Sequence, residues 1–180
     1  MYSEEDLIYR CLQNEGRAQE EFYKRFAPKM YGVCLRFAKN QMEADDILQD
    51  GFIKVFTNLK TYRGEGSLEG WVRRTIVNTA INLYKKNAKY LRDIEIEKAE
   101  VVQNTEEGAL DKITVQELLA LIRELPTGYR MVFNLNVIEG YTHKEISQLL
   151  NISENTSKSQ LSRARQTLQK KLKDIKGSQR

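Results

Sequence analysis

The chain has 180 residues, enough for one ordinary domain or two small ones. Its 29 Lys and Arg residues against 25 Asp and Glu residues give a formal net charge of +4. With 41% hydrophobic residues the chain is too apolar for a disordered tail. Its mean hydropathy of −0.59 and the lack of any apolar run near about 18 residues exclude a membrane span. The first residues lack the basic and apolar stretches of a secretory signal, so we expect a cytoplasmic protein without membrane insertion.

Neither disulfides nor metal sites are expected. Cys11 and Cys34 form no CxxC pair and lie among apolar neighbours, so we expect reduced thiols in the core. His143 is the only histidine, and we expect it to face solvent in the first turn of a helix rather than to bind a metal. The glycines are not followed by Gly-Lys-Ser/Thr, which excludes a P-loop, and nothing else indicates a cofactor.

Helical periodicity runs through the chain, and its two prolines and ten glycines leave few turn signals, which predicts an all-α fold. Charge is unevenly distributed along it. Residues 71–92 carry six bases and no acid, residues 93–111 carry seven acids and one base, and residues 158–176 carry seven bases and one acid. This pattern predicts two helical, polyanion-binding domains, 1–92 and 112–180, joined by an acidic flexible linker at 93–111. Solvated basic helix faces are the alternative, and charge alone does not decide between the two.

The helix predicted over residues 45–59 has two contrasting sides. Its core stripe comprises Leu48, Phe52, Val55, Phe56 and Leu59. The other side carries Asp46, Gln49, Asp50, Ile53 and Lys54. The carboxylates would repel phosphate, and an outward isoleucine among them is typical of a protein-docking face.

A glycine-bearing loop and a second helix follow. The loop contains Tyr62, Arg63, Gly64 and Ser67, and it can wrap an extruded base. On the helix from about Gly70, the core face comprises Val72, Ile76, Thr79, Ala80 and Leu83. The opposite face carries Trp71, Arg74, Asn78, Asn82, Lys85 and Lys89. An indole for stacking, amides for base edges and cations for phosphates would make a platform for single-stranded DNA. A core tryptophan beside a solvated basic face is the alternative.

The C-terminal segment is predicted to be a helix-turn-helix. Thr142 and Glu145 can form a capping box, Asn151 suits a left-handed helix end, and Ser153 can cap a second helix starting at Glu154. The second helix has an apolar stripe of Leu161, Ala164 and Leu168. Its outer face is short, polar or cationic, which suits a DNA groove, and its candidate DNA contacts are Lys158, Ser159, Ser162 and Arg163. Lys170, Lys171 and Lys173 lie beyond the predicted reading end, and Ser157 places an unexplained polar group on the apolar stripe.

Three stretches together resemble a known family. They are residues 45–52 (DDILQDGF), Tyr62-Arg63-Gly64 with Trp71 and Asn78-Thr79-Ala80, and residues 145–165 from Glu145-Ile146 to Arg163-Ala164-Arg165. In this order they resemble the bacterial RNA polymerase sigma factors, in the extracytoplasmic-function (ECF) subfamily of the sigma-70 family. The resemblance implies a promoter-specific initiation factor that binds core polymerase, recognises −35 and −10 elements, helps open the DNA and is not an enzyme.

The resemblance also implies roles for single residues. Residues 1–92 would be region 2, whose docking residues on the β′ clamp coiled coil are Asp46, Gln49, Asp50 and Ile53. The −10 recognition and melting residues would be Tyr62, Arg63, Gly64, Ser67, Trp71, Arg74, Asn78, Asn82 and Lys85. Residues 112–180 would be region 4, which contacts the β flap and reads the −35 element through Thr156, Lys158, Ser159, Ser162, Arg163 and Arg165. The linker would thread through the polymerase channels, and an anti-sigma factor is an expected partner.

Two alternatives come from other classes of protein. A helix-turn-helix repressor or activator would dimerise through its N-terminal half and bind a palindrome by itself. A nuclease would hold a metal on Asp45, Asp46 and Asp50, but no base, nucleophile or converging histidine accompanies these carboxylates.

Overall fold

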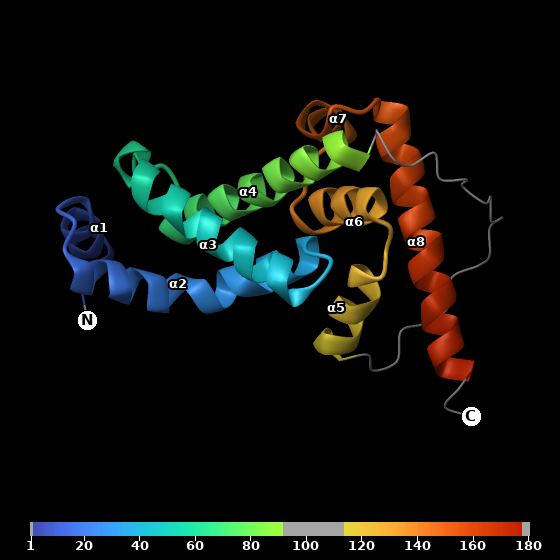
Figure 1. Cartoon of the computed structure of the whole chain (residues 1–180), viewed down its shortest axis with the longest axis horizontal. Coiled ribbons are helices and arrows are strands. Elements are labelled where there is room, and N and C mark those ends of the chain that lie inside the picture. The colour runs from blue at the N-terminus through green and yellow to red at the C-terminus, as the bar shows by residue number, and fades with distance from the viewer. Residues whose placement is uncertain (1, 92–113, 178–180) are drawn as a thin grey trace. The chain divides into compact units, whose positions relative to one another are not determined.

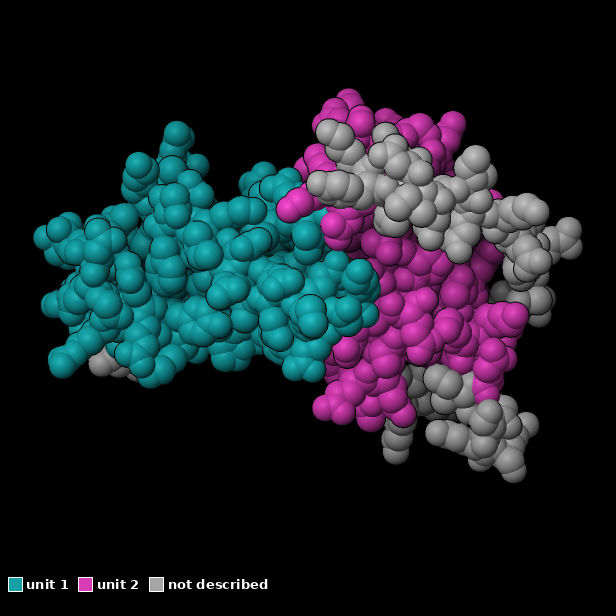
Figure 2. Space-filling view, viewed as in Figure 1, with its two compact units in different colours: residues 1–83 teal, residues 84–180 magenta. Residues whose placement is uncertain are grey.

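The computed structural model describes residues 2–91 and 114–177, and all regular elements within these ranges are helical. The chain divides into two compact units, Met1–Leu83 and Tyr84–Arg180, which Figure 2 colours separately. The prediction of an all-α chain with two helical parts is therefore confirmed. The predicted acidic linker, 93–111, lies outside the described residues. The division at Leu83 falls within a helix rather than at residue 92, so the predicted domain limits stay a prediction.

The first unit contains three helices, a short 3-10 helix and most of a fourth helix (Figure 1). They are α1 (Glu4–Leu12), α2 (Gly16–Phe37), α3 (Gln41–Asn58), η1 (Leu59–Thr61) and α4 (Leu68–Leu91). Asn40 begins α3, because its side-chain oxygen accepts a hydrogen bond from the Glu43 amide at 2.8 Å. Aromatic side chains join α2 to α3: the ring centroids of Phe22 and Phe56 lie 5.5 Å apart.

The predicted core faces of α3 and α4 are buried. On α3, Phe56 is half-buried and the other predicted core residues are buried: Leu48, Phe52, Val55 and Leu59. On α4 the predicted core residues are also buried, except for Leu83, which is half-buried. Val77 and Ile81 are buried as well, so α4 buries a wider arc than predicted. Gly51 lets the two helices approach closely, because a Cβ at this position would lie 2.3 Å from Ile76 Cδ1.

The second unit is built around one long helix. Its elements are α5 (Val115–Arg123), α6 (Thr127–Phe133), the π-helical segment η2 (Asn134–Ile138), α7 (His143–Leu150) and α8 (Glu154–Gly177). Helix α8 packs against α5, α6 and α7. Its core cluster comprises Leu121, Ile122, Leu125, Ala164 and Leu168.

A buried arginine closes α5. Arg130 is 2% exposed, and its Nη1 donates to the carbonyl oxygens of Arg123 at 2.8 Å and Leu125 at 3.1 Å. The last carbonyls of a helix have no partner within the helix and carry the negative end of its dipole, so a guanidinium there is well placed. This contact of Arg130 with the end of α5 was not predicted from the sequence.

The helix-turn-helix geometry is confirmed at each predicted residue. Thr142 and Glu145 form a complete capping box at the start of α7. Asn151 ends α7 in the left-handed conformation, at φ 55° and ψ 50°. The Ser153 hydroxyl accepts a hydrogen bond from the Thr156 amide at 2.9 Å, which caps α8.

The expectation that His143 faces solvent is wrong. His143 is half-buried, and its Nδ1 shares a hydrogen bond of 2.8 Å with the hydroxyl of Ser157, which is fully buried. The contact joins the first turn of α7 to α8. It also explains the polar residue on the apolar stripe of α8, because a buried hydroxyl needs a hydrogen-bond partner.

Both cysteines are buried and free of disulfide bonds, as predicted. Burial raises the pKa of the Cys11 thiol to about 11 and that of Cys34 to about 12. Across the described ranges, no helix is both long and apolar enough to cross a membrane.

The cysteine pKa values predict slow thiol chemistry in the folded protein. The thiolate is the reactive form, and both raised pKa values keep the thiols protonated at pH 8. We expect neither cysteine to react readily with a disulfide reagent under native conditions, and both to react at once in guanidinium chloride. Rapid native labelling of Cys34, located by peptide mass spectrometry, would contradict its burial.

The contact of His143 with Ser157 predicts a specific loss of stability. Ser157→Ala should lower the free energy of unfolding by about 1 kcal/mol, because it removes one partner of an internal hydrogen bond. Ser162→Ala is the matched control: Ser162 is exposed on the same helix, and the substitution brings the same gain in helix propensity. Equal stability of the two variants in urea denaturation would show that the hydrogen bond contributes nothing.

Candidate functional site

The outer face of α3 forms an open groove with α2. The groove has a volume of about 510 Å³, and Asp46, Gln49 and Ile53 line it, while Asp50 lies exposed on the same helix. Ile53 is 59% exposed, so a large apolar side chain stands in water among carboxylates. Tyr23 of α2 completes the groove, with its ring centroid 4.7 Å from that of Phe52. Tyr23 was not predicted from the sequence, because its contact with Phe52 joins two separate helices.

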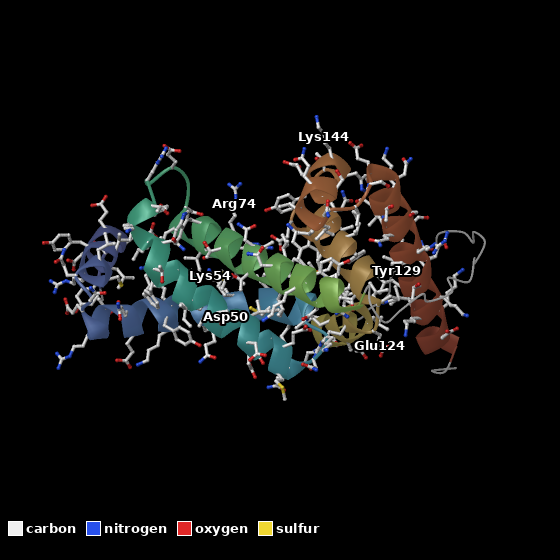
Figure 3. The ribbon with its side chains drawn as sticks, turned by 45° about the horizontal axis from the view of Figure 1, so that its top comes forward. Asp50, Lys54, Arg74, Glu124, Tyr129 and Lys144 are labelled. Carbon is white, nitrogen blue, oxygen red and sulfur yellow. The ribbon has the colours of Figure 1, made fainter. Side chains whose placement is uncertain are left out.

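Lys54 does not belong to this groove. Its Nζ donates to the hydroxyl of Thr79 on α4, at 3.4 Å, and its side chain is half-buried. Figure 3 labels Lys54 together with Asp50 on α3. The groove therefore combines carboxylates, an amide and apolar side chains, without the cation that the helical periodicity placed beside them.

The glycine-bearing loop closes on itself before α4 begins. The Tyr62 hydroxyl donates to the carbonyl oxygen of Gly66 at 2.9 Å, and the Ser67 hydroxyl accepts from the Gly70 amide at 3.1 Å. Gly64 and Gly66 have φ values of 74° and 88°, which favour glycine. Arg63, Gly64 and Ser67 are exposed, as a loop that contacts a ligand requires.

The loop brings an aromatic pair together at the start of α4. The ring centroids of Tyr62 and Trp71 lie 5.8 Å apart, with an interplanar angle of 57°, and both side chains are half-buried. Along the rest of the predicted face, Arg74, Asn78, Asn82 and Lys85 are all exposed. Figure 3 shows Arg74 projecting outward from α4. The side chain of Lys89 lies outside the described residues.

The proposed reading face of α8 is mostly exposed. Lys158, Ser159, Ser162 and Arg165 are exposed, whereas Thr156 and Arg163 are half-buried. Thr156 is occupied by the helix start, where its hydroxyl lies 2.8 Å from that of Ser153. Arg163 Nη1 donates to the Tyr129 hydroxyl on α6, at 3.2 Å.

Farther along, α8 serves the core of its unit rather than an open surface. Leu168 belongs to the core cluster and Leu172 packs against it. Lys171 forms an ion pair with Glu124 at the end of α5. Lys170 and Lys173 are exposed, and the position of all three lysines beyond the reading end stays a prediction.

The carboxylates of α3 do not form a metal site. Within the described residues, no group of three or more His, Cys, Asp or Glu side chains is arranged to hold a metal ion. The nuclease alternative, which placed a metal on Asp45, Asp46 and Asp50, therefore has no geometric support.

Comparisons with known proteins agree with this arrangement. The chain matches the family models for Sigma-70 region 2 over residues 22–90 and Sigma-70, region 4 over residues 115–168. It is 31% identical over 161 residues to the ECF RNA polymerase sigma factor SigW of Bacillus subtilis, covering 83% of this chain and 86% of that protein. The chain belongs to the ECF sigma factors. It is also 26% identical over 185 residues to the RNA polymerase sigma-H factor of Pseudomonas aeruginosa, covering 96% of this chain and 95% of that one.

A solved structure of another sigma factor has a similar fold. The sigma factor RpoE of Bartonella quintana, in complex with the anti-sigma factor NepR, aligns with a TM-score of 0.51 and 19% identity, covering 86% of this chain and 96% of that one. The resemblance stated from the sequence is thereby confirmed, and with it the class of function: a promoter-specific transcription initiation factor. The roles of the individual surface residues stay predictions.

Proposed function

We propose that this ECF sigma factor docks on core RNA polymerase through the groove of α3 and reads a two-part promoter with α4 and α8. The observation that carries the proposal is the separation of chemistry between helices. The outer face of α3 is acidic and apolar, whereas the outer faces of α4 and α8 are cationic and polar. Phosphate is repelled by the first face and attracted by the other two.

The docking partner proposed for α3 is the β′ clamp coiled coil. At the rim of the groove, Asp46 and Asp50 would pair with basic side chains of the coiled coil. Ile53 would contribute apolar area beside Tyr23. The β flap is the second proposed polymerase contact, at the second unit. There α5 exposes two apolar side chains, Val115 at 75% and Leu118 at 42%.

The first unit would open the −10 element by trapping unpaired bases. The loop from Tyr62 to Ser67 would surround a flipped base, with Arg63 and Gly64 at its rim and Asn78 at a base edge. Each base stacked on an aromatic ring is worth roughly 1–3 kcal/mol, so a few captured bases offset the cost of unpairing. Arg74, Asn82 and Lys85 would hold the backbone of the strand. This mechanism needs no nucleotide hydrolysis and no catalytic group from this chain, because the polymerase performs the chemistry.

The second unit would read the −35 element through α8. Lys158, Ser159, Ser162, Arg163 and Arg165 are the proposed contacts, with Thr156 near the start of the helix. As a partner of RNA polymerase, the protein would act in the cytoplasm. We also expect an anti-sigma factor to bind it, as NepR binds RpoE of Bartonella quintana.

Run-off transcription tests the proposal as a whole. Purified core polymerase, with and without this chain, would transcribe a genomic fragment library at stated salt. We expect discrete start sites that share two upstream motifs and appear only when both components are present. Tight binding of a palindrome by the chain alone, without polymerase-dependent starts, would identify the regulator alternative instead.

The docking face predicts the effect of a charge reversal. Asp50→Lys should weaken binding to core polymerase roughly tenfold or more, because it places a cation where the proposed partner surface is basic. Binding would be measured by titrating labelled protein with core enzyme. Glu5→Lys on α1 is the matched control: Glu5 is exposed, lies outside α3, and its reversal changes the net charge equally. Equal dissociation constants for the two variants would place the docking surface elsewhere.

A further inference from the structure

Arg163 differs from Thr156 and Ser159, whose hydroxyls bond within the start of α8, in having a side-chain partner on another helix. Its Nη1 donates to the Tyr129 hydroxyl at 3.2 Å, although 34 residues separate the two in the chain. Arg163 is half-buried, whereas Lys158, Ser159 and Ser162 are exposed. The guanidinium is therefore held against α6 rather than left to sample many conformations in water.

The tyrosine is itself firmly placed. Its side chain is half-buried and packs against the core cluster to which Ala164 and Leu168 of α8 belong. A ring held by packing has only two side-chain torsions to fix, so its hydroxyl is an acceptor at a defined position beside α8. The hydrogen bond joins α6 to α8 at the residue that follows Ser162.

The chemistry of this acceptor suits a residue that contacts DNA. A carboxylate partner would neutralise the guanidinium and repel phosphate, whereas a hydroxyl accepts one hydrogen bond and brings no charge. Across the described parts of the chain, no carboxylate forms an ion pair with Arg163. The guanidinium has five N–H donors, so donors remain for a phosphate oxygen or a guanine edge after one is used.

We propose that Tyr129 is a positioning residue for promoter recognition: its hydroxyl orients the Arg163 guanidinium toward the upstream element. This inference rests on the proposed function of α8. The contribution comes from pre-organisation, because a long arginine side chain that is already ordered loses less conformational entropy when it binds. Tyr129 need not touch DNA to have this effect.

A double-mutant cycle tests the proposal on the full chain assembled with core polymerase. The measurement is the dissociation constant for a promoter fragment found by run-off transcription, and for the same fragment with its upstream element scrambled. Arg163→Ala should raise the dissociation constant roughly ten- to a hundredfold on the native fragment. Tyr129→Phe, which keeps the ring and removes the hydroxyl, should raise it about three- to tenfold. In the Arg163→Ala background, Tyr129→Phe should change it less than about twofold.

A second cycle separates positioning from general damage to the unit. Lys158 is another proposed DNA contact of α8 and is exposed, whereas the hydrogen bond of the Tyr129 hydroxyl is with Arg163, so Tyr129→Phe and Lys158→Ala should act independently. On the scrambled fragment the effect of Tyr129→Phe should disappear. Thermal unfolding of each variant shows whether the folded fraction has changed, and the coupling is compared between variants that are fully folded at the assay temperature.

The outcomes distinguish this inference from the proposed function. If Tyr129→Phe weakens binding equally with and without Arg163, the hydroxyl does not act through the guanidinium and the inference is wrong. If Tyr129→Phe has no effect while Arg163→Ala weakens binding to the native fragment, α8 reads the element but needs no positioning by Tyr129. If Arg163→Ala weakens binding to native and scrambled fragments equally, the upstream role of Arg163 itself fails.

Discussion

The second unit depends on one constraint, which is that α8 has to be held by one side so that its other side stays open. The apolar stripe of Leu161, Ala164 and Leu168 satisfies it, because these side chains are at most 6% exposed. Ala164 and Leu168 pack with side chains of α5 and α6, and burial of this apolar stripe is the main favourable contribution to the position of the helix. The side chains proposed to contact DNA, from Lys158 to Arg165, belong to the remaining arc. A recognition helix buried more deeply would lose that arc, and one buried less would not be held.

The same constraint operates in the first unit with an additional consequence. Helices α3 and α4 approach closely where Gly51 faces Ile76, so one side of each helix packs against the other helix. Their outer sides carry opposite chemistry: carboxylates and Ile53 on α3, and amides and cations on α4. Lys54 fits this division, because its ammonium is drawn toward Thr79 and away from the groove. Neighbouring helices can thus bind two different partners, a protein surface and a polyanion, without the partners competing for one surface.

Features that depend on neighbours within one helix could be predicted from the sequence. The capping box of Thr142, the left-handed Asn151 and the apolar stripes follow from spacing alone, and the structure has each of them. The contacts that were missed join one helix to another. They are Tyr23 beside α3, Arg130 at the end of α5, and Tyr129 beside Arg163. A helical wheel assigns a direction to a side chain, but it does not say what another helix places in that direction.

His143 shows how such a contact can still be detected. Its place in the first turn of a short helix led to the prediction of a solvent-facing residue, and the structure shows a hydrogen bond to buried Ser157. The signal was present on the other helix, because a buried serine hydroxyl needs a partner, which is either a backbone carbonyl of its own helix or a polar group from another element. Among the described residues, His143 provides it.

Polar contacts also settle what the apolar stripe leaves open. Burial of apolar area is not directional, so a helix can rotate by some degrees about its axis at little cost. Hydrogen bonds and ion pairs restrict that rotation, because their strength falls steeply with distance and angle. In the described part of α8, contacts of this kind run from Ser157 to His143, from Arg163 to Tyr129 and from Lys171 to Glu124. They join it to α7, to α6 and to the end of α5, one to each neighbouring helix. Since the rotation of a recognition helix decides which side chains reach the base edges, these three contacts connect the packing of the unit to what it can read.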